Sequence, residues 1–287
     1  MAALLILLST ASHLSESLFI KRYNAKYHRG GFVFTAFVSL FSMLFFVLTD
    51  RGGFHAPALM WGYGLIAGVL YCMASFLTYI ALQIGSYAMT MLILSYSVIL
   101  SVGYGIVFLK EEVTVFTVIG ILLVLFSLYL VRADKKEGES KKKLSFRWLV
   151  CVLASAIGSG MFGVVQRMQQ IRFENTCTNE FMIVALGFSA ALLTIVGVAR
   201  NRSDLGYVLK HGLPWTLGAG ASNGATNAMI VFLHTLMPIS LSSPIRVGVK
   251  VIASFALSVF LFREKFQRRQ IFGVALGTVA VILLNIK

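Results

Sequence analysis

Apolar stretches of membrane-spanning length follow one another along almost the whole chain, separated by short polar segments. A helix crosses the hydrocarbon core of a bilayer in roughly 20 residues, and somewhat fewer suffice inside a packed bundle. The pattern predicts ten spans, at residues 2–21, 32–49, 57–82, 86–108, 114–131, 146–166, 179–199, 213–234, 239–262 and 269–286. We therefore expect an all-α integral membrane protein with little chain left for a soluble domain.

One connecting segment differs from the other short loops, because it is long, charged and free of aromatic residues. It contains the run ADKKEGESKKK between the fifth and sixth spans, a composition typical of linkers. It divides the chain into a first five-helix unit at 1–131, a cytoplasmic linker at 132–146 and a second five-helix unit at 147–287.

Composition and charge agree with a membrane protein. Hydrophobic residues make up 58% of the chain and charged residues 13%, whereas soluble domains carry roughly twice that charge. The net charge of +14 arises from short basic runs between spans, where topology and anionic headgroups explain it without nucleic acid. Lys and Arg number 18 in one set of alternate loops and 5 in the other. The positive-inside rule then places both termini outside, in what we expect to be a bacterial inner membrane.

The ends of the two units resemble each other. The segment FLKEEVTVFTVIGILLVL, beginning at Phe108, aligns with LFREKFQRRQIFGVALGT, beginning at Leu261. In both, a cation–Glu pair stands nine residues before a glycine. Because each unit has five spans, the second unit must be inverted relative to the first, which is the architecture of many secondary carriers. The predicted fold is therefore ten transmembrane helices as two inverted five-helix repeats.

These motifs resemble those of the EamA-type carriers of the drug/metabolite transporter superfamily, over essentially the whole chain. The family's Glu at the end of the fourth helix of each unit, followed by a Gly in the fifth, is matched by Glu111 and Gly120 and by Glu264 and Gly273. The family's proline in the middle of the fourth helix is absent from the first unit, and only Pro244 resembles it in the second. The resemblance implies a central cavity lined mainly by the first, third and fourth helices of each unit.

Ionisable residues inside membrane spans are costly, which makes them candidates for function. The ninth span carries Arg246 and Lys250, four residues apart and so on one helix face. In the repeat alignment their counterparts are Ile93 and Ser97. A difference within a symmetric scaffold is where a preference for one cargo would be encoded. We predict that at least one of these cations binds a carboxylate or phosphate of the cargo.

The first span carries His13 and Glu16 on one polar face. One interpretation is that Glu16 forms a structural ion pair with a cation of the ninth span. Another is that His13 or Glu16 takes up a proton and couples transport to proton movement.

Uncharged polar residues complete the candidate site. Asn223 and Asn227 lie four residues apart in the middle of the eighth span, where amides suit either a polar cargo or hydrogen bonds between helices. Tyr71, Tyr79 and Tyr96, on the third and fourth spans, either line the same cavity or pack between helices.

The sequence thus predicts a secondary transporter rather than an enzyme. It would move a small polar metabolite, anionic or zwitterionic and preferably amino-acid-like, by alternating access through a central cavity. The alternative is an exporter of organic cations or drugs, proton-coupled through Glu16, whose cargo Arg246 and Lys250 would repel. We expect a small-molecule substrate, the lipid bilayer and in the coupled case protons as partners, no cofactor, no metal and no nucleic acid, and a monomer or homodimer.

Overall fold

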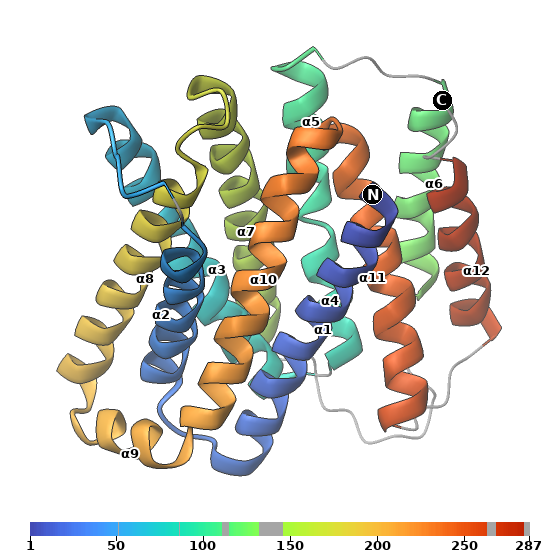
Figure 1. The fold of residues 1–287 in the computed structure, drawn as a ribbon. Coiled ribbons are helices and arrows are strands. Elements are labelled where there is room, and N and C mark those ends of the chain that lie inside the picture. The colour runs from blue at the N-terminus through green and yellow to red at the C-terminus, as the bar shows by residue number, and fades with distance from the viewer. Residues whose placement is uncertain (51, 86, 111–114, 132–145, 263–267, 284–287) are drawn as a thin grey trace.

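The computed structural model describes residues 1–287 except 51, 86, 111–114, 132–145, 263–267 and 284–287. The described residues form helices that run up and down through one bundle (Figure 1). These are α1 Ala2–Tyr27, α2 Gly31–Thr49, α3 Ala58–Ile84, α4 Tyr87–Ser95, α5 Val98–Val107, α6 Val115–Val131, α7 Phe146–Arg172, α8 Thr178–Arg200, α9 Ser203–His211, α10 Leu213–Leu236, α11 Ile239–Phe262 and α12 Arg268–Leu283. The start of α1 and the end of α12 lie at the same end of the bundle, opposite α9 (Figure 1).

Each predicted span coincides with helical residues, although not always with one helix. Among the described residues, α1, α2, α3, α7 and α8 are long and apolar enough to cross a membrane. Helices α10 and α11 are equally long, with 24 residues each, but they carry polar side chains that line the interior. The count of ten spans and the unit boundaries remain predictions. Most of the predicted linker, together with Glu111 and Glu264, lies outside the described residues.

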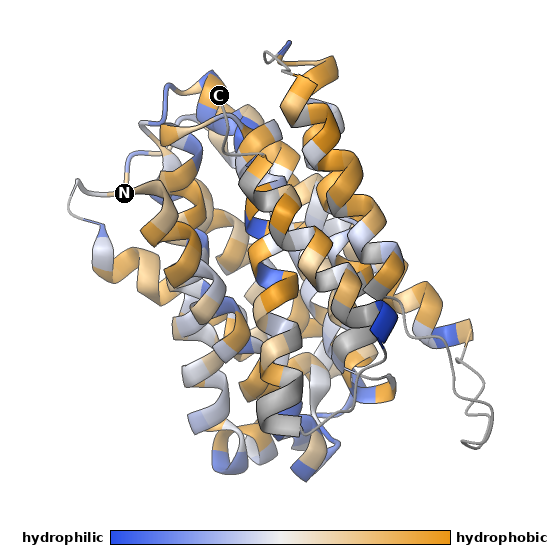
Figure 2. Cartoon of the chain, turned by 90° about the vertical axis from the view of Figure 1, so that its right-hand side faces the viewer, coloured by the Kyte–Doolittle hydropathy of each residue, from blue (hydrophilic) through white to orange (hydrophobic). Residues whose placement is uncertain are grey.

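The outer faces of the helices are apolar. Large hydrophobic side chains such as Leu48 and Ile195 are 84% and 67% exposed. Hydrophobic residues cover much of the helices between the two ends of the bundle, while hydrophilic residues gather toward the ends and in the loops (Figure 2). A surface of this kind is costly in water and suits lipid, so the fold is that of an integral membrane protein.

Helices of the first unit pack mainly against helices of the second. Helix α1 packs against α10, and α3 packs against α7; α2 packs against both α8 and α10, and α3 also against α8. Helices α5 and α11 form another pair, and α6 and α12 form a pair at the edge opposite α2 and α8 (Figure 1). The interior therefore lies between the two units rather than within either one.

Two glycine pairs allow the closest of these approaches. Gly64 and Gly68 of α3 face α8, and a Cβ on Gly68 would lie 2.8 Å from a backbone carbonyl oxygen of that helix. Gly220 and Gly224 of α10 face α2, where a Cβ on Gly220 would lie 2.8 Å from a backbone carbonyl oxygen. The spacing of small residues four apart is typical of close helix contact in membranes.

Tight connections join the helices at the end where α9 lies. Gly30, at φ 73°, precedes α2 directly, and this left-handed conformation favours glycine. A proline occupies the first turn of α10, where its missing N–H costs no helical hydrogen bond. The short helix α9, which the apolar pattern did not predict, is fixed by an ion pair of 2.8 Å between Arg29 Nε and Asp204 Oδ1.

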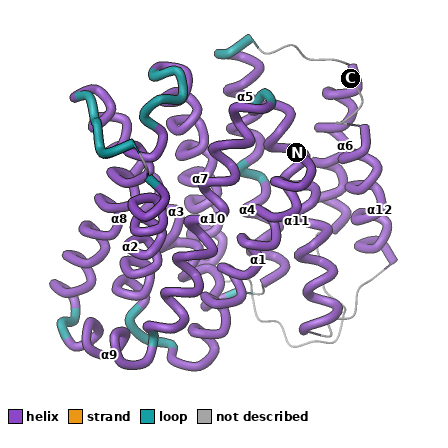
Figure 3. Tube along the Cα trace, viewed as in Figure 1, coloured by secondary structure: helices purple, strands orange, loops and turns teal. Residues whose placement is uncertain are grey.

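The predicted fourth span is not one helix, and the expectation of a continuous helix at 86–108 is wrong. Helix α4 ends at Ser95 and α5 begins at Val98, with a turn between them (Figure 3). The Tyr96 N–H donates to the Ile93 carbonyl at 3.0 Å, and the following amides repeat this three-residue spacing. Such bonds tighten the backbone from α-helical to 3₁₀ geometry, which breaks the helix without a proline.

Candidate functional site

A cavity lies between the two units, lined by α1 to α5, α7, α10 and α11. It offers about 230 Å³ to the centre of a water molecule, enough for on the order of ten waters or one small metabolite. The predicted site residues that line it are His13, Glu16, Tyr71, Tyr79, Asn223, Asn227, Arg246 and Lys250. Residues from four of the predicted spans therefore converge on one space.

Tyr96 is the exception among the predicted site residues. It does not line the cavity and instead packs, half-buried, against the apolar cluster around Val98 and Val247. The lining residues of this segment, Met91, Leu94, Val98 and Ser101, follow a spacing of three and four that leaves Tyr96 on another face. Its neighbour Ser97 lines the cavity in its place.

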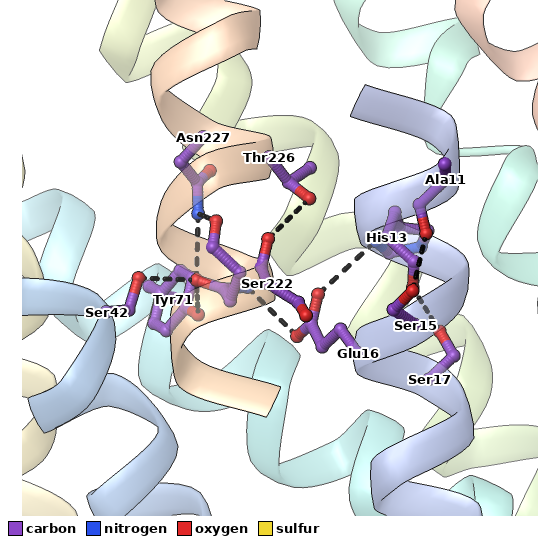
Figure 4. Close-up of polar contacts among 11 residues, drawn as sticks. Ala11, His13, Ser15, Glu16, Ser17, Ser42, Tyr71, Ser222, Thr226 and Asn227 are labelled. Carbon is purple, nitrogen blue, oxygen red and sulfur yellow. Dashed lines mark hydrogen bonds and ion pairs between the residues drawn. The ribbon is translucent and has the colours of Figure 1, made fainter. Parts of the chain in front are cut away.

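Asn223 stands at the centre of a hydrogen-bond network that joins four helices. Its partners Ser42, Tyr71, Glu16 and Asn227 are labelled in Figure 4. Its Oδ1 accepts hydrogen bonds from Tyr71 Oη at 2.7 Å, from Ser42 Oγ at 2.8 Å and from Asn227 Nδ2 at 2.9 Å. Its Nδ2 donates to Glu16 Oε1 at 2.9 Å. Three donors on one side and a carboxylate on the other determine the orientation of the amide. The Asn223 amide therefore bonds to neighbouring helices and holds Glu16 at the cavity wall, while Asn227 supports it from the same helix.

Glu16 contacts the Asn223 amide and His13 rather than the cations of α11. Its Oε2 lies 3.4 Å from His13 Nδ1 and has no hydrogen-bond partner among the described residues. Within the described part of the chain, neither Arg246 nor Lys250 comes within the 4.0 Å that defines an ion pair with a carboxylate. The expected structural ion pair between α1 and α11 is therefore not formed in this conformation.

Arg246 and Lys250 lie one helix turn apart on the cavity wall. Both line the cavity, and four residues of helix separate their Cα atoms by about 6 Å along the axis. Arg246 Nε is buried and has no hydrogen-bond partner among the described residues. A buried guanidinium nitrogen without a partner is unfavourable in a medium of low dielectric constant. The site can therefore stabilise an anionic group placed between the two helical units.

Two further lining residues, Gln166 and His234, were not among the predicted site residues. They are 2% and 3% exposed, and each stands at the last position of a predicted span. Helix α7 continues to Arg172 and α10 to Leu236, so both residues lie within helices and face inward. The signal available in the sequence was that His234 is an ionisable residue in an apolar segment.

A buried aromatic cluster separates the cavity from α9. Phe34 and Tyr79 line this end of the cavity, and the ring of Tyr23 stacks on Phe34 with centroids 4.2 Å apart. Tyr23 Oη donates to the Arg29 carbonyl at 2.8 Å, and Val208 of α9 belongs to the same buried cluster. The structure is therefore closed toward the end of the bundle that carries α9.

Comparison with known proteins gives a family match for part of the chain and a fold for nearly all of it. Residues 1–133 match the model of the EamA-like transporter family. A solved structure described only as the crystal structure of a protein is similar with a TM-score of 0.71 and 16% sequence identity, over 99% of this chain and 96% of that chain. At that identity the likeness shows the fold alone. No curated protein matches the sequence.

Proposed function

Because the chain is an EamA-type protein of the drug/metabolite transporter superfamily, we propose that it moves a small anionic or zwitterionic metabolite, preferably amino-acid-like, across a membrane. The family is one of membrane transporters, not enzymes. The observation that carries the proposal is the position of Arg246 and Lys250. Both line the cavity between the units, and neither has an acidic ion-pair partner among the described residues.

The charges of the cavity wall favour an anionic group over a cation. Arg246 and Lys250 contribute two positive charges, and Glu16 contributes one negative charge that Asn223 already binds. Inside a membrane protein such charges are weakly screened, so the excess positive charge attracts an anion and repels a cation. A zwitterion would fit with its carboxylate toward α11 and its ammonium group toward Glu16. The alternative of an organic-cation exporter is disfavoured on the same ground.

Alternating access is supported by the way the two units pack. Exchanging the first unit with the second converts the pairing of α1 with α10 into that of α7 with α3. The same exchange leaves the pairs α2 with α8, α5 with α11 and α6 with α12 unchanged. Inverted repeats of this kind switch the open side when the two units exchange conformations. The proposed transporter would then open at the end near α9, which the aromatic cluster now closes.

We further propose an orientation and a coupling. The basic loops predict that the end carrying α9 faces the cytoplasm of a bacterium and that both termini lie outside. Glu16 Oε2, which is buried beside His13, would bind the coupling proton if transport is proton-driven. Uptake driven by an imposed pH gradient, and lost from the Glu16→Gln variant, would support this coupling.

The proposed cargo class can be tested by ligand-induced stabilisation. Protein in lipid nanodiscs would be heated with amino acids, organic anions or quaternary amines, because a ligand that binds the native state raises the unfolding temperature. Anions or zwitterions should stabilise the wild type and should not stabilise the Arg246→Gln/Lys250→Gln double variant. Lys210→Gln, which removes an exposed lysine on α9, is the control. Stabilisation by quaternary amines alone, or a response unchanged in the double variant, would contradict the proposal.

A further inference from the structure

The two cations of α11 stand in different surroundings. Helices α1 and α11 both start at the end of the bundle opposite α9 (Figure 1), so the rise along each helix places Lys250 nearer than Arg246 to the depth of Glu16. At the Arg246 level, Arg167 Nη1 donates to the His234 carbonyl oxygen at 2.9 Å, and among the described residues that line the cavity Glu16 is the only carboxylate. The negative charge of Glu16 thus offsets Lys250, while the Arg246 level keeps an excess of positive charge.

The groups at the Arg246 level also lack hydrogen-bond partners. His234 is 3% exposed, and neither of its ring nitrogens has a partner among the described residues. The same holds for Arg246 Nε and for Ser243 Oγ, whose residue is 2% exposed. All three residues line the cavity. Buried polar groups normally have hydrogen-bond partners, and leaving several without them costs free energy.

One ligand chemistry satisfies all three groups at once. A carboxylate accepts hydrogen bonds from a guanidinium, an imidazole N–H and a hydroxyl, and its charge compensates the arginine. Arg167 is held nearby by a hydrogen bond of 2.9 Å from its Nη1 to the His234 carbonyl oxygen, so it adds positive charge at the rear of this group.

We propose that Arg246, His234 and Ser243 form an anion subsite that takes one carboxylate of the cargo, while Lys250 balances Glu16 at the neighbouring level. This inference rests on the proposed function, which requires only that Arg246 or Lys250 contact the cargo. It goes further by assigning the carboxylate to the Arg246 level.

The subsite can be tested with acetate, which carries the proposed chemistry and requires no knowledge of the cargo. Protein with ¹⁵N-labelled histidine would be titrated in nanodiscs with sodium acetate, at constant pH and at an ionic strength kept constant with sodium chloride. The ring resonances of His234 are identified by their absence from His234→Asn. They should shift with a saturable dependence on acetate, at a midpoint on the order of 10 mM for a single charged contact.

Matched variants distinguish the two levels. Arg246→Gln should raise the acetate midpoint about tenfold or more, whereas Lys250→Gln, which removes the same charge one turn away, should raise it about threefold or less. Arg246→Lys keeps the charge and should restore part of the response, which separates loss of binding from loss of fold.

The outcomes separate the subsite from the proposed function. An absence of any acetate-dependent shift of His234, or equal effects of Arg246→Gln and Lys250→Gln, would overturn the subsite. An intact acetate response in a protein that transports no anion or zwitterion in liposomes would instead overturn the proposed function and leave the subsite standing.

Discussion

The fourth helices of the two units occupy equivalent places in the fold but differ in shape and charge. In the second unit, α11 runs unbroken from Ile239 to Phe262 although Pro244 lies inside it. In the first unit, the equivalent segment breaks into α4 and α5 beside Ser97, where the sequence has no proline. Arg246 and Lys250 occur only on the unbroken helix. The two copies have therefore divided their tasks, one providing a bend and the other providing charge.

The bend in the first unit is accommodated by a small residue on the neighbouring helix. A Cβ on Gly160 of α7 would lie 2.9 Å from the Ser97 carbonyl oxygen, so only glycine allows the turn to approach α7 this closely. Ser97 itself lines the cavity without adding charge. Under the proposed function, the symmetric scaffold would serve the motion while the second unit alone would provide the selectivity.

The largest effect on transport should come from removing a positive charge on α11. Removing the polar group at the equivalent position of the first unit should have little effect. Arg246→Gln should lower uptake of the anionic cargo into proteoliposomes about 100-fold, and Lys250→Gln about tenfold, because each leaves a charge of the complex without its partner. Ser97→Ala, at the position equivalent to Lys250, should change uptake less than about twofold. Equal losses in all three variants would show that the two fourth helices do not differ in function.

A smaller effect is expected on the opposite wall. Glu16→Gln keeps an oxygen that can accept from Asn223 but removes the charge, so uptake should fall about tenfold and lose its dependence on pH. Initial uptake rates measured across a range of pH give both results. Glu174→Gln, which changes an exposed carboxylate in the connection between α7 and α8, serves as the control. A pH profile of Glu16→Gln identical to that of the wild type would exclude Glu16 from coupling.

Where the units are alike, they should respond alike to substitution. Gly68→Ala and Gly220→Ala each place a methyl group 2.8 Å from a backbone carbonyl oxygen of the facing helix, so each should destabilise the protein by about 1–3 kcal/mol. Thermal unfolding in nanodiscs measures this loss. Gly62→Ala has nothing within 4 Å of the added Cβ and should leave the midpoint unchanged or raise it slightly. Destabilisation by Gly62→Ala as large as by the other two would contradict the assigned contacts.

The smallest effect distinguishes two tyrosines of the first unit. Tyr71→Phe removes one of three donors to Asn223 Oδ1 and should weaken cargo affinity about threefold to tenfold, because the amide then holds Glu16 less firmly. Tyr96→Phe should leave affinity unchanged, since Tyr96 does not line the cavity. Ligand-induced stabilisation measured at several cargo concentrations provides both values. A larger loss of cargo affinity for Tyr96→Phe than for Tyr71→Phe would contradict this assignment. It would support the prediction from the sequence that Tyr96 lines the cavity.

The sequence predicted helices wherever apolar residues continued long enough to cross a membrane. It also predicted that Arg246, Lys250 and Glu16 belong to one interior, since charges in such helices are tolerated only where something polar faces them. The break beside Ser97 was not predictable, because it rests on three-residue hydrogen bonds and on Gly160 of another helix. The same applies to α9, whose short polar segment has no apolar signal.

The contacts within the site could not be derived from residue types. Asn223 was a candidate for either cargo binding or helix contact, and only its four hydrogen bonds show that it joins α1, α2, α3 and α10. Whether Glu16 pairs with α11 depends on distances between helices far apart in sequence. His234 stands at the end of a predicted span, where the pattern gives no indication of which way a side chain faces.

The central claim is that a single cavity is reached alternately from the two sides of the membrane. Ser243→Cys would be introduced into a protein with Cys72, Cys151 and Cys177 replaced by Ala, and treated with a membrane-impermeant, negatively charged thiosulfonate in right-side-out and inverted vesicles. The residue lines the cavity and is 2% exposed in the present conformation. We predict labelling from each side, slowed on both sides by the transported anion. Labelling from one side only, whatever the cargo concentration, would identify a blind pocket and contradict the account.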